Sequence, residues 1–305
     1  MLNEKFKLSV IIPTYNRCRN LEYTIRSLVD QNIAREDFEI IVADDGSDDD
    51  TFKMVKQFTD IVNFKYVYQV DDGYRPASAR NLGITASEGN ICLFIDSGII
   101  LKKDCLLQHI NCHAEKQDDV AIIGYTYGYT QHGETEEELM NLVDPNDAEK
   151  SMATLVARKR FLDIREKIYR RYDDRLDGLH AAWSLFWGGH LSVKRKTLYE
   201  VGMFDENYDG NWGCEDNDLG YRLQRADCRL FFCRQAAVLH LPHGTNLDLK
   251  KKEGYTNCQY FHQKFQTDET KIFLDHYLRE ITGHEVIDFN EVVSKHRKSV
   301  ASGVY

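Results

Sequence analysis

The sequence has no long apolar run: nowhere among its 305 residues do about 18 uncharged apolar residues follow one another. It therefore offers no membrane-spanning helix. The segment Met1–Lys7 alternates polar and charged residues and lacks the apolar core of a signal peptide. These absences favour a cytoplasmic protein, and they leave a peripheral association with a membrane open.

An excess of basic residues is also missing, since the net charge is -10 at pH 7. Surfaces that follow a phosphate backbone are usually basic, so we do not expect nucleic acid as the main partner. The eight cysteines are scattered and form no CxxC pair. A chain of this length buries a sizeable core without covalent staples, so we expect reduced thiols.

Apolar runs and amphipathic segments alternate through the first half of the chain. Continuous apolar runs, which are typical of strands covered on both faces, predict strands over residues 8–12, 38–43, 64–70 and 91–95. The segments between them predict helices over residues 17–31, 50–58 and 76–86. This alternation predicts an α/β fold with a mostly parallel, Rossmann-like sheet flanked by helices. Ligands in such sheets bind at the carboxyl ends of the strands.

The second half of the chain is less regular. Residues 134–138 are typical of an acidic helix start. The basic stretch 158–175 predicts a helix with Phe161, Ile164 and Ile168 facing inward, either as a solvated face or as an acceptor- or phosphate-binding one. We expect a catalytic domain over residues 1–245, divided into a nucleotide-binding half (about 1–125) and an acceptor half (about 126–245), and a helical extension over 246–305.

Carboxylates follow two of the predicted strands. Asp44 and Asp45 precede a Gly-Ser pair and are suited to accept hydrogen bonds from a base imide or from ribose hydroxyls. A helix cap and turn explains the same two residues equally well. Asp96 follows the strand at 91–95 and is suited to hold a divalent cation against a diphosphate, with a cap as the alternative.

The densest group of carboxylates lies within residues 212–218, where Glu215, Asp216 and Asp218 fall within four positions. Like charges so close together raise a pKa, which suits a general base. Trp212 beside them offers a wall on which a sugar ring can stack. The alternative interpretation is a capped and solvated helix start.

Two further groups contain histidine. His240 and His243 follow an apolar run, and a histidine at the end of a strand can be a metal ligand. Four residues with zinc-ligand side chains share much of one helix side: Cys105, His109, Cys112 and His113. No second ligand pair follows them at zinc spacing, so we expect them to be structural rather than metal-binding.

Four segments of the first half together resemble the family 2 glycosyltransferases of GT-A fold: Val10–Arg17, Ile41–Ser47, Ala79–Gly83 and Phe94–Asp96. Three later segments are similar to a branch of that family that includes bacterial chondroitin polymerase domains: Phe186–His190, Gly202–Glu206 and Trp212–Asp216. The last of these, with its Trp-Gly-x-Glu-Asp pattern, is also similar to β-1,4-galactosyltransferases and polypeptide GalNAc-transferases. The resemblance covers about residues 7–243, and the order of the motifs makes it specific.

The resemblance implies a UDP-sugar donor and an inverting transfer. The implied donor-binding residues are Pro13, Thr14 and Tyr15 around the base, Asp44 and Asp45 at the uracil, Asp72 and Arg80 at the nucleotide and diphosphate, and Asp96 at the metal. Gly188 and Gly189 would let the backbone approach a sugar closely. Trp212 and Glu215 would contact sugar, and Asp216 would be the general base.

The metal motif departs from the family pattern. The family has Asp-x-Asp, whereas this chain has Asp96-Ser97-Gly98 and lacks the second carboxylate. The resemblance implies a divalent cation, Mn²⁺ or Mg²⁺, held by Asp96 and His240. The alternatives are weak metal binding, or basic groups such as Arg80 that take over the charge of the metal.

The sequence therefore predicts a UDP-sugar-dependent hexosyltransferase of polysaccharide or glycoconjugate biosynthesis. The alternative is a non-catalytic nucleotide- or glycan-binding relative, because the metal motif is degenerate. A nucleotidylyltransferase is disfavoured, since no Gly-rich, basic triphosphate loop follows the first strand. The transferred sugar, the acceptor (a glycan, a peptide or a small molecule) and the oligomeric state stay open. The polar tail from Leu247 onward is expected to cover the acceptor cleft or to pair with another subunit.

Overall fold

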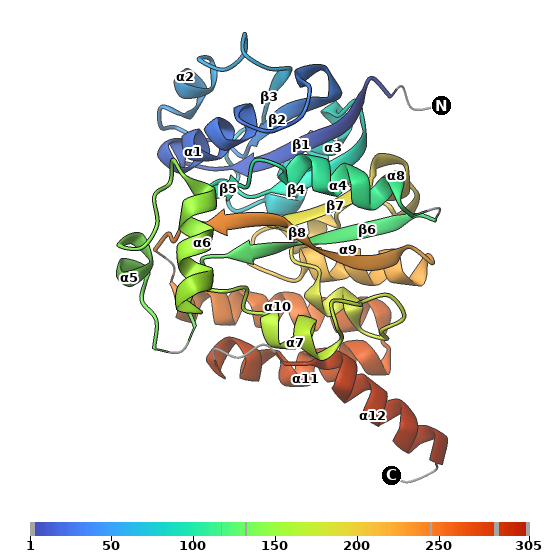
Figure 1. Cartoon of the computed structure of the whole chain (residues 1–305). Coiled ribbons are helices and arrows are strands. Elements are labelled where there is room, and N and C mark those ends of the chain that lie inside the picture. Colours follow the sequence, from blue (N-terminus) through green and yellow to red (C-terminus); the bar gives the residue numbers. More distant parts are fainter. Residues whose placement is uncertain (1–3, 117, 132, 245, 284–286, 303–305) are drawn as a thin grey trace.

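The computed structural model describes residues 4–116, 118–131, 133–244, 246–283 and 287–302, and its strands form one eight-stranded sheet in the order β3-β2-β1-β4-β7-β6-β8-β5 (Figure 1). The strands are β1 (Phe6–Thr14), β2 (Phe38–Asp44), β3 (Phe64–Tyr68), β4 (Gly89–Ile95), β5 (Ile99–Leu101), β6 (Val120–Tyr127), β7 (His190–Lys194) and β8 (Arg229–His240). The helices are α1 (Cys18–Val29), α2 (Thr51–Val55), α3 (Pro76–Ala86), α4 (Cys105–Ala114), α5 (Glu136–Met140), α6 (Ala148–Arg158), α7 (Glu166–Arg171), α8 (Arg195–Val201), α9 (Glu215–Arg225), α10 (Leu247–Phe265), α11 (Asp268–Gly283) and α12 (Phe289–Ser302).

The sheet has a parallel part and a mixed part. β1 pairs in parallel with β2 and β4, and β2 pairs in parallel with β3. Beyond β4, β7 is antiparallel to both of its neighbours, β6 and β8 are parallel, and β5 is antiparallel to β8. The predicted α/β sheet is confirmed. The alternation of elements in the first half could not reveal β7, because this strand enters the sheet only after the long excursion through α5, α6 and α7.

Most predicted elements of the first half are present, with shifted ends. The helix predicted over residues 76–86 is α3 with the same bounds, whereas α2 is only five residues long. The single helix predicted over residues 158–175 is wrong, since this stretch contains only the last residue of α6, Arg158, and the short helix α7. Phe161 takes a left-handed backbone (φ 52°). Arg165 is buried in an ion pair with Asp163 (2.8 Å) rather than lying on a solvated face.

Successive residues of β1 face two different cores. Val10 and Ile12 pack with apolar side chains of α1, α2 and α4, whereas Ile11 packs with those of α3, α8 and α9. All three side chains are fully buried, and each such burial contributes about 1.5–3 kcal/mol. Helices therefore cover both faces of the sheet, and the loops at the carboxyl ends of β1, β2 and β4 are left to form a site.

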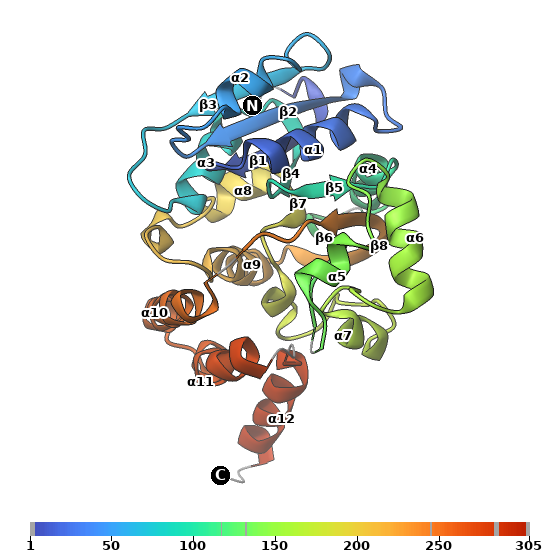
Figure 2. The same ribbon diagram turned by 90° about the vertical axis from the view of Figure 1, so that its left-hand side faces the viewer.

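The helices α10, α11 and α12 contribute to a third core, which lies below the sheet in Figure 2. This core includes Trp183 and Tyr208 of the preceding segment. The side-chain amide of Asn257 on α10 donates to the carbonyl oxygens of Tyr208 (3.1 Å), Asn211 (3.1 Å) and Gly213 (2.8 Å). The start of the extension is thus bound directly to the loop that precedes α9.

Two simple expectations can be compared with the structure. The eight cysteines are present as thiols rather than in disulfide bonds. Among the described residues, no helix combines the length and the apolar character that a membrane crossing requires.

Candidate active site

Two adjacent carboxylates end β2, and their surroundings differ. Asp44 is fully buried, and its Oδ1 accepts hydrogen bonds from the backbone of Gly46 (3.1 Å) and Ser47 (2.7 Å). The Tyr66 hydroxyl donates to Oδ2 of Asp44 (2.6 Å). This carboxylate closes the turn after β2, which is the role that the capping alternative foresees.

Asp45 connects β2 to the loop before α3. Its carboxylate accepts hydrogen bonds from the Gln69 amide (2.6 Å) and the Arg75 backbone N–H (2.8 Å), and it pairs with the Arg75 guanidinium (2.9 Å). On the other side of the same loop, the Tyr15 hydroxyl donates to Asp71 (3.1 Å). These contacts gather the ends of β1, β2 and β3 into one wall.

The remaining predicted residues of this wall present both buried and accessible groups. Thr14 is buried, and its Oγ1 has no hydrogen-bond partner among the described residues. Pro13 is half-buried, whereas Asp72 and Tyr15 are exposed. Gly46 has a positive φ of 99°, and a Cβ there would lie 2.4 Å from the backbone nitrogen of Asp71. Glycine is therefore required for the wall to close at this point.

Arg80 is the central cation of the site. This buried side chain of α3 pairs through Nη1 with Glu215 Oε1 (2.9 Å) and through Nη2 with Asp96 Oδ1 (3.2 Å). Burial would lower its pKa, but the carboxylates of Asp96, Glu215 and Asp216 raise the pKa above its ordinary value. The guanidinium therefore stays charged and joins the end of β4 to the start of α9.

Two glycines bring the backbone close to these charged groups. The backbone N–H of Gly188 donates to Asp216 Oδ2 (2.7 Å). A Cβ at Gly188 would lie 2.9 Å from Arg80 Nη2, and one at Gly189 would lie 3.1 Å from Asp96 Oδ2. Side chains at these two positions would therefore push against the groups that the site holds together.

Asp216 lies in the first turn of α9 and is half-buried. Burial and the charge of Glu215 raise its pKa to about 7, while the Gly188 N–H and Arg80 act in the opposite direction. A carboxylate with this pKa is suited to accept a proton near neutral pH. The third carboxylate of the motif is structural: Asp218 is buried and pairs with Arg222 (2.5 Å) and Lys264 (2.7 Å).

His240 ends β8 next to the charged groups. Its ring stacks on Tyr129 with the centroids 5.2 Å apart, and its Nδ1 is buried without a hydrogen-bond partner among the described residues. Burial and the nearby His243 lower its pKa to about 4, so the ring is neutral and able to bind a metal. Asp96, whose side chain is 45% exposed, is close enough for its charge to act on His240. These two residues fit a divalent cation, with most of its coordination left to water and phosphate oxygens.

Sequence reasoning missed several residues that surround this centre. Tyr74, about half exposed, lies near the charges of Glu215, Arg80 and Asp96. In the sequence, the only signal for it is a tyrosine in the turn just before the predicted helix 76–86, which is a weak one. Two cations near Asp96 were also missed. Arg17 lies 3.3 Å from His243, and Lys250 of α10 is close enough to feel the charges of both Asp96 and Arg17.

Lys250 could not be found from its sequence, because a lysine in a polar helix is usually solvated. Its Nζ lies 4.8 Å from the ring centroid of Trp212, and Glu253 one turn later accepts a hydrogen bond from the Trp212 backbone (3.3 Å). Burial and repulsion by Arg17 lower the pKa of Lys250. The C-terminal extension therefore contributes to the site through Trp212.

Comparison with known proteins agrees with this geometry. Residues 9–178 match the model of the family described as glycosyl transferase family 2. The chain belongs to glycosyl transferase family 2. Residues 177–244, which contain Gly188, Glu215 and Asp216, match a second model, described as the N-terminal domain of galactosyltransferase.

Two relatives in this family show the extent of the similarity. Validoxylamine A glucosyltransferase of Streptomyces hygroscopicus subsp. jinggangensis is 34% identical over 257 residues, which are 84% of this chain and 60% of the relative. Chondroitin synthase of Escherichia coli is 32% identical over 239 residues, which are 76% of this chain and 34% of the relative. The second match confirms the branch that the motifs indicate. The chain therefore spans less than two thirds of the first protein and about one third of the second.

Solved structures confirm the GT-A fold of this family 2 chain. Staphylococcus aureus TarS residues 1–349, in complex with UDP-GlcNAc, superimposes with a TM-score of 0.62 at 16% identity, covering 92% of this chain and 72% of that chain. The mannosyltransferase PcManGT from Pyrobaculum calidifontis, in complex with GDP-Man and Mn²⁺, gives a TM-score of 0.60 at 14% identity, covering 98% and 81%.

Proposed function

We propose that this chain is a glycosyltransferase that moves a hexose or hexosamine from a UDP-sugar to an acceptor in one inverting displacement. The observation that carries the proposal is the environment of Asp216. Its pKa is raised to about 7, and the Gly188 N–H fixes one of its oxygens beside the Arg80, Glu215 and Asp96 cluster. A base that is ionised near neutral pH and lies beside a charged centre is suited to remove the proton of an acceptor hydroxyl during sugar transfer.

Asp216 would take the proton of the acceptor hydroxyl as that oxygen attacks the anomeric carbon. Glu215, held by Arg80 at 2.9 Å, would contact the sugar, and Trp212 would give it an apolar wall. The bond between the anomeric carbon and the diphosphate breaks on the opposite face, so the configuration inverts. The new negative charge remains on UDP, and the proton remains on Asp216 until solvent accepts it.

The donor would lie along the ends of β1, β2 and β4. Tyr15, Asp45 and Asp72 border the wall on which the uracil and ribose would lie, and the buried Thr14 Oγ1 is a polar group without a protein partner. UDP is favoured as the nucleotide because two of the similar S. aureus TarS structures are complexes, one with UDP-GlcNAc and one with UDP. A glucose or N-acetylglucosamine donor agrees with the names of the similar proteins.

Positive charge at the diphosphate would come from two sources. Asp96 and His240 would hold Mn²⁺ or Mg²⁺, which supplies charge to stabilise the leaving diphosphate. Arg17 and Lys250 lie at the same end and would add protein charge where the second Asp of the motif is absent. Arg80 does not serve this purpose alone, since two carboxylates already engage its guanidinium.

The decisive experiment supplies UDP-glucose, UDP-GlcNAc, UDP-GalNAc and UDP-galactose with Mn²⁺ and measures UDP release, with and without candidate glycan, peptide and small-molecule acceptors. We expect release from one of these donors and, by NMR of the product, an anomeric configuration opposite to that of the donor. A product that retains the configuration would contradict the single displacement.

The second candidate function is a non-catalytic nucleotide- or glycan-binding protein, which the absent second metal-ligand Asp favours. Calorimetry with UDP separates the two candidates. UDP binding that needs Mn²⁺ and accompanies turnover supports the transferase. UDP binding without transfer or donor hydrolysis from any donor supports the binding protein, and no UDP binding at all would contradict both assignments.

A further inference from the structure

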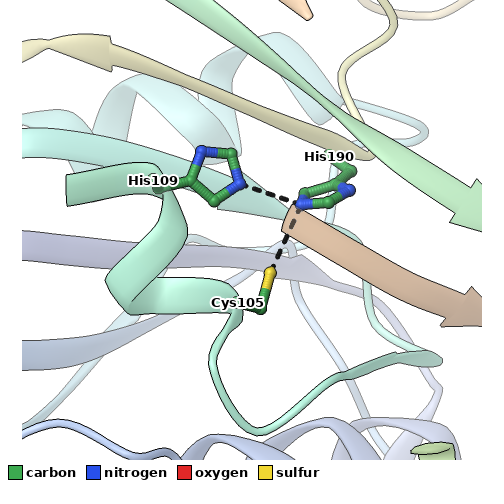
Figure 3. Close-up of side chains that lie close together, drawn as sticks. All are labelled: Cys105, His109 and His190. Atoms are coloured by element: carbon green, nitrogen blue, oxygen red, sulfur yellow. Dashed lines mark hydrogen bonds between the residues drawn. The ribbon is translucent and has the colours of Figure 1, made fainter. Parts of the chain in front are cut away.

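A compact group of metal-ligating side chains lies outside the donor site. Cys105 and His109 are one turn apart on α4, and His190 begins β7. Their ligand atoms all lie within 4.8 Å of one another. Figure 3 shows the thiol and the two rings pointing toward a common centre. Among the residues that the structure describes, this is the one group of three or more His, Cys, Asp or Glu that converges in this way.

The distances between these atoms suit a tetrahedral transition-metal ion. Zinc lies about 2.0–2.1 Å from a histidine nitrogen and about 2.3 Å from a thiolate, so its ligand atoms are about 3.3–3.6 Å apart. Cys105 Sγ and His190 Nε2 are 3.6 Å apart, and His109 Nε2 and His190 Nε2 are 2.9 Å apart. A separation of the two rings by about 0.4 Å would bring the two histidine nitrogens to this spacing. The remaining pair, Cys105 Sγ and His109, lies within 4.8 Å and closes to the same spacing when the metal binds.

Neighbouring groups fix how the rings are oriented. His109 Nδ1 lies 2.9 Å from Ser192 Oγ, which in turn lies 2.9 Å from His113 Nε2. Because Nδ1 of His109 is hydrogen-bonded to Ser192, its Nε2 points toward His190 and Cys105, which is the arrangement of metal-bound histidines.

The chain also keeps a space for the His190 ring. A Cβ at Gly124 of β6 would lie 1.9 Å from the ring carbon Cε1 of His190, so a larger residue requires the ring to move. Glycine weakens the interior of a strand. Gly124 lies where the register between β6 and β8 shifts, and the absence of a side chain there leaves room for the His190 ring.

We propose that Cys105, His109 and His190 bind a transition-metal ion of the zinc or copper class at a structural site separate from the donor cation. On binding, the Cys105 thiol releases one proton to solvent and becomes a thiolate, and the two histidines bind as neutral rings without any change of oxidation state. A water or an anion would take the fourth position. His190 pairs with Ile95 next to Asp96, so the ion ties α4 to the strand end that carries the donor site.

The experiment measures metal by mass spectrometry in the full chain, purified without added metal and then loaded with Zn²⁺, Cu⁺ or Co²⁺. We expect about one equivalent of metal per chain and, with Co²⁺, a thiolate-to-cobalt charge-transfer band. Cys105→Ser should remove that band. Cys92→Ser, which changes an equally buried cysteine on β4, should keep it. The metal found in the purified chain before loading distinguishes zinc from copper.

The two cation sites must also respond separately. Asp96→Asn should leave the cobalt–thiolate band unchanged, whereas Cys105→Ser should leave Mn²⁺ binding at the donor site measurable by calorimetry. The wild-type chain tests the proposal even if a buried variant fails to fold. A cobalt-loaded wild-type chain without the thiolate band, or equal metal content in Cys105→Ser and Cys92→Ser, would overturn the proposal.

Discussion

The short segment from Gly188 to His190 separates two groups of titratable side chains with opposite behaviour. On the Gly188 side, the buried Arg80 guanidinium pairs with the buried Glu215 carboxylate at 2.9 Å. On the His190 side, burial lowers the pKa of His109 and raises that of Cys105, so both are neutral. A buried charge persists only where an opposite charge compensates for the loss of water. The same sheet therefore carries a paired, charged group at the carboxyl end of β4 and a group of neutral side chains beside it.

The largest expected effect comes from removing the base on the charged side. Asp216→Asn keeps the shape of the side chain, and its amide oxygen can still accept the hydrogen bond that the Gly188 N–H donates, but it cannot take a proton. Turnover should fall by about 10²–10⁴-fold, while UDP affinity by calorimetry stays within a factor of about two of the wild-type value. Asp227→Asn, an exposed change just after α9, is the control. Near-normal turnover in Asp216→Asn would remove this residue from the mechanism.

The next effect tests whether Arg80 is what keeps the charged side stable. Arg80→Met leaves Glu215 buried without its cation, which costs about 3 kcal/mol, the lower end of the usual range because Asp96 is partly exposed. Urea unfolding measures this loss. The double variant Arg80→Met with Glu215→Gln should recover part of the free energy of unfolding. A double variant no more stable than the single one would show that pairing is not the cause.

How well the sequence predicts each group depends on where its members lie in the chain. Asp96 and Asp216 could be singled out from short motifs, because Asp96 directly follows a strand and Asp216 lies at the start of a helix. Arg80, which lies beside them in the structure, belongs to a third short motif. Asp44 was ambiguous by nature, since the turn that a carboxylate closes has the same residues as a ligand site. His190 is 85 positions from Cys105. Helical spacing placed Cys105 and His109 on one side of a helix, and we expected that group to be structural. The spacing could not show that β7 brings His190 beside it.

The division of residues 1–245 and 246–305 stays a prediction for a similar reason. Composition changes at about residue 246, but composition does not report that the amide of Asn257 binds three carbonyl groups of the earlier segment. The contact between Lys250 and Trp212 likewise joins segments that no short motif connects. Long-range contacts of single polar side chains are the part of the site that pattern and periodicity leave out.

A smaller effect is the pH dependence that Asp216 imposes. The base must be ionised, so kcat/KM should rise with pH through about 7 and be about tenfold lower one pH unit below that value. The free energy of unfolding depends on pH in the opposite direction. The folded state binds more protons than the unfolded state between about 3.9 and about 7, so stability should fall as pH rises through that window. Asp216→Asn should abolish both trends, measured by rate profiles and urea unfolding. A wild-type profile that is flat between about pH 6 and about pH 8, one unit on each side of the pKa, would contradict the assignment.

The smallest effect concerns the cation that the extension adds to the charged side. Lys250→Gln removes a partly buried positive charge near Asp96, and partly exposed charges of this kind contribute about 0.2–1 kcal/mol. UDP should therefore bind about two- to fivefold more weakly, whereas Lys252→Gln, an exposed change on the same helix, should leave binding unchanged. Because a divalent cation and Lys250 would neutralise the same diphosphate, the loss should be larger in EDTA than in Mn²⁺. Equal losses in the two conditions would mean that Lys250 and the cation act at different places, and would leave Trp212 as the reason for the position of Lys250.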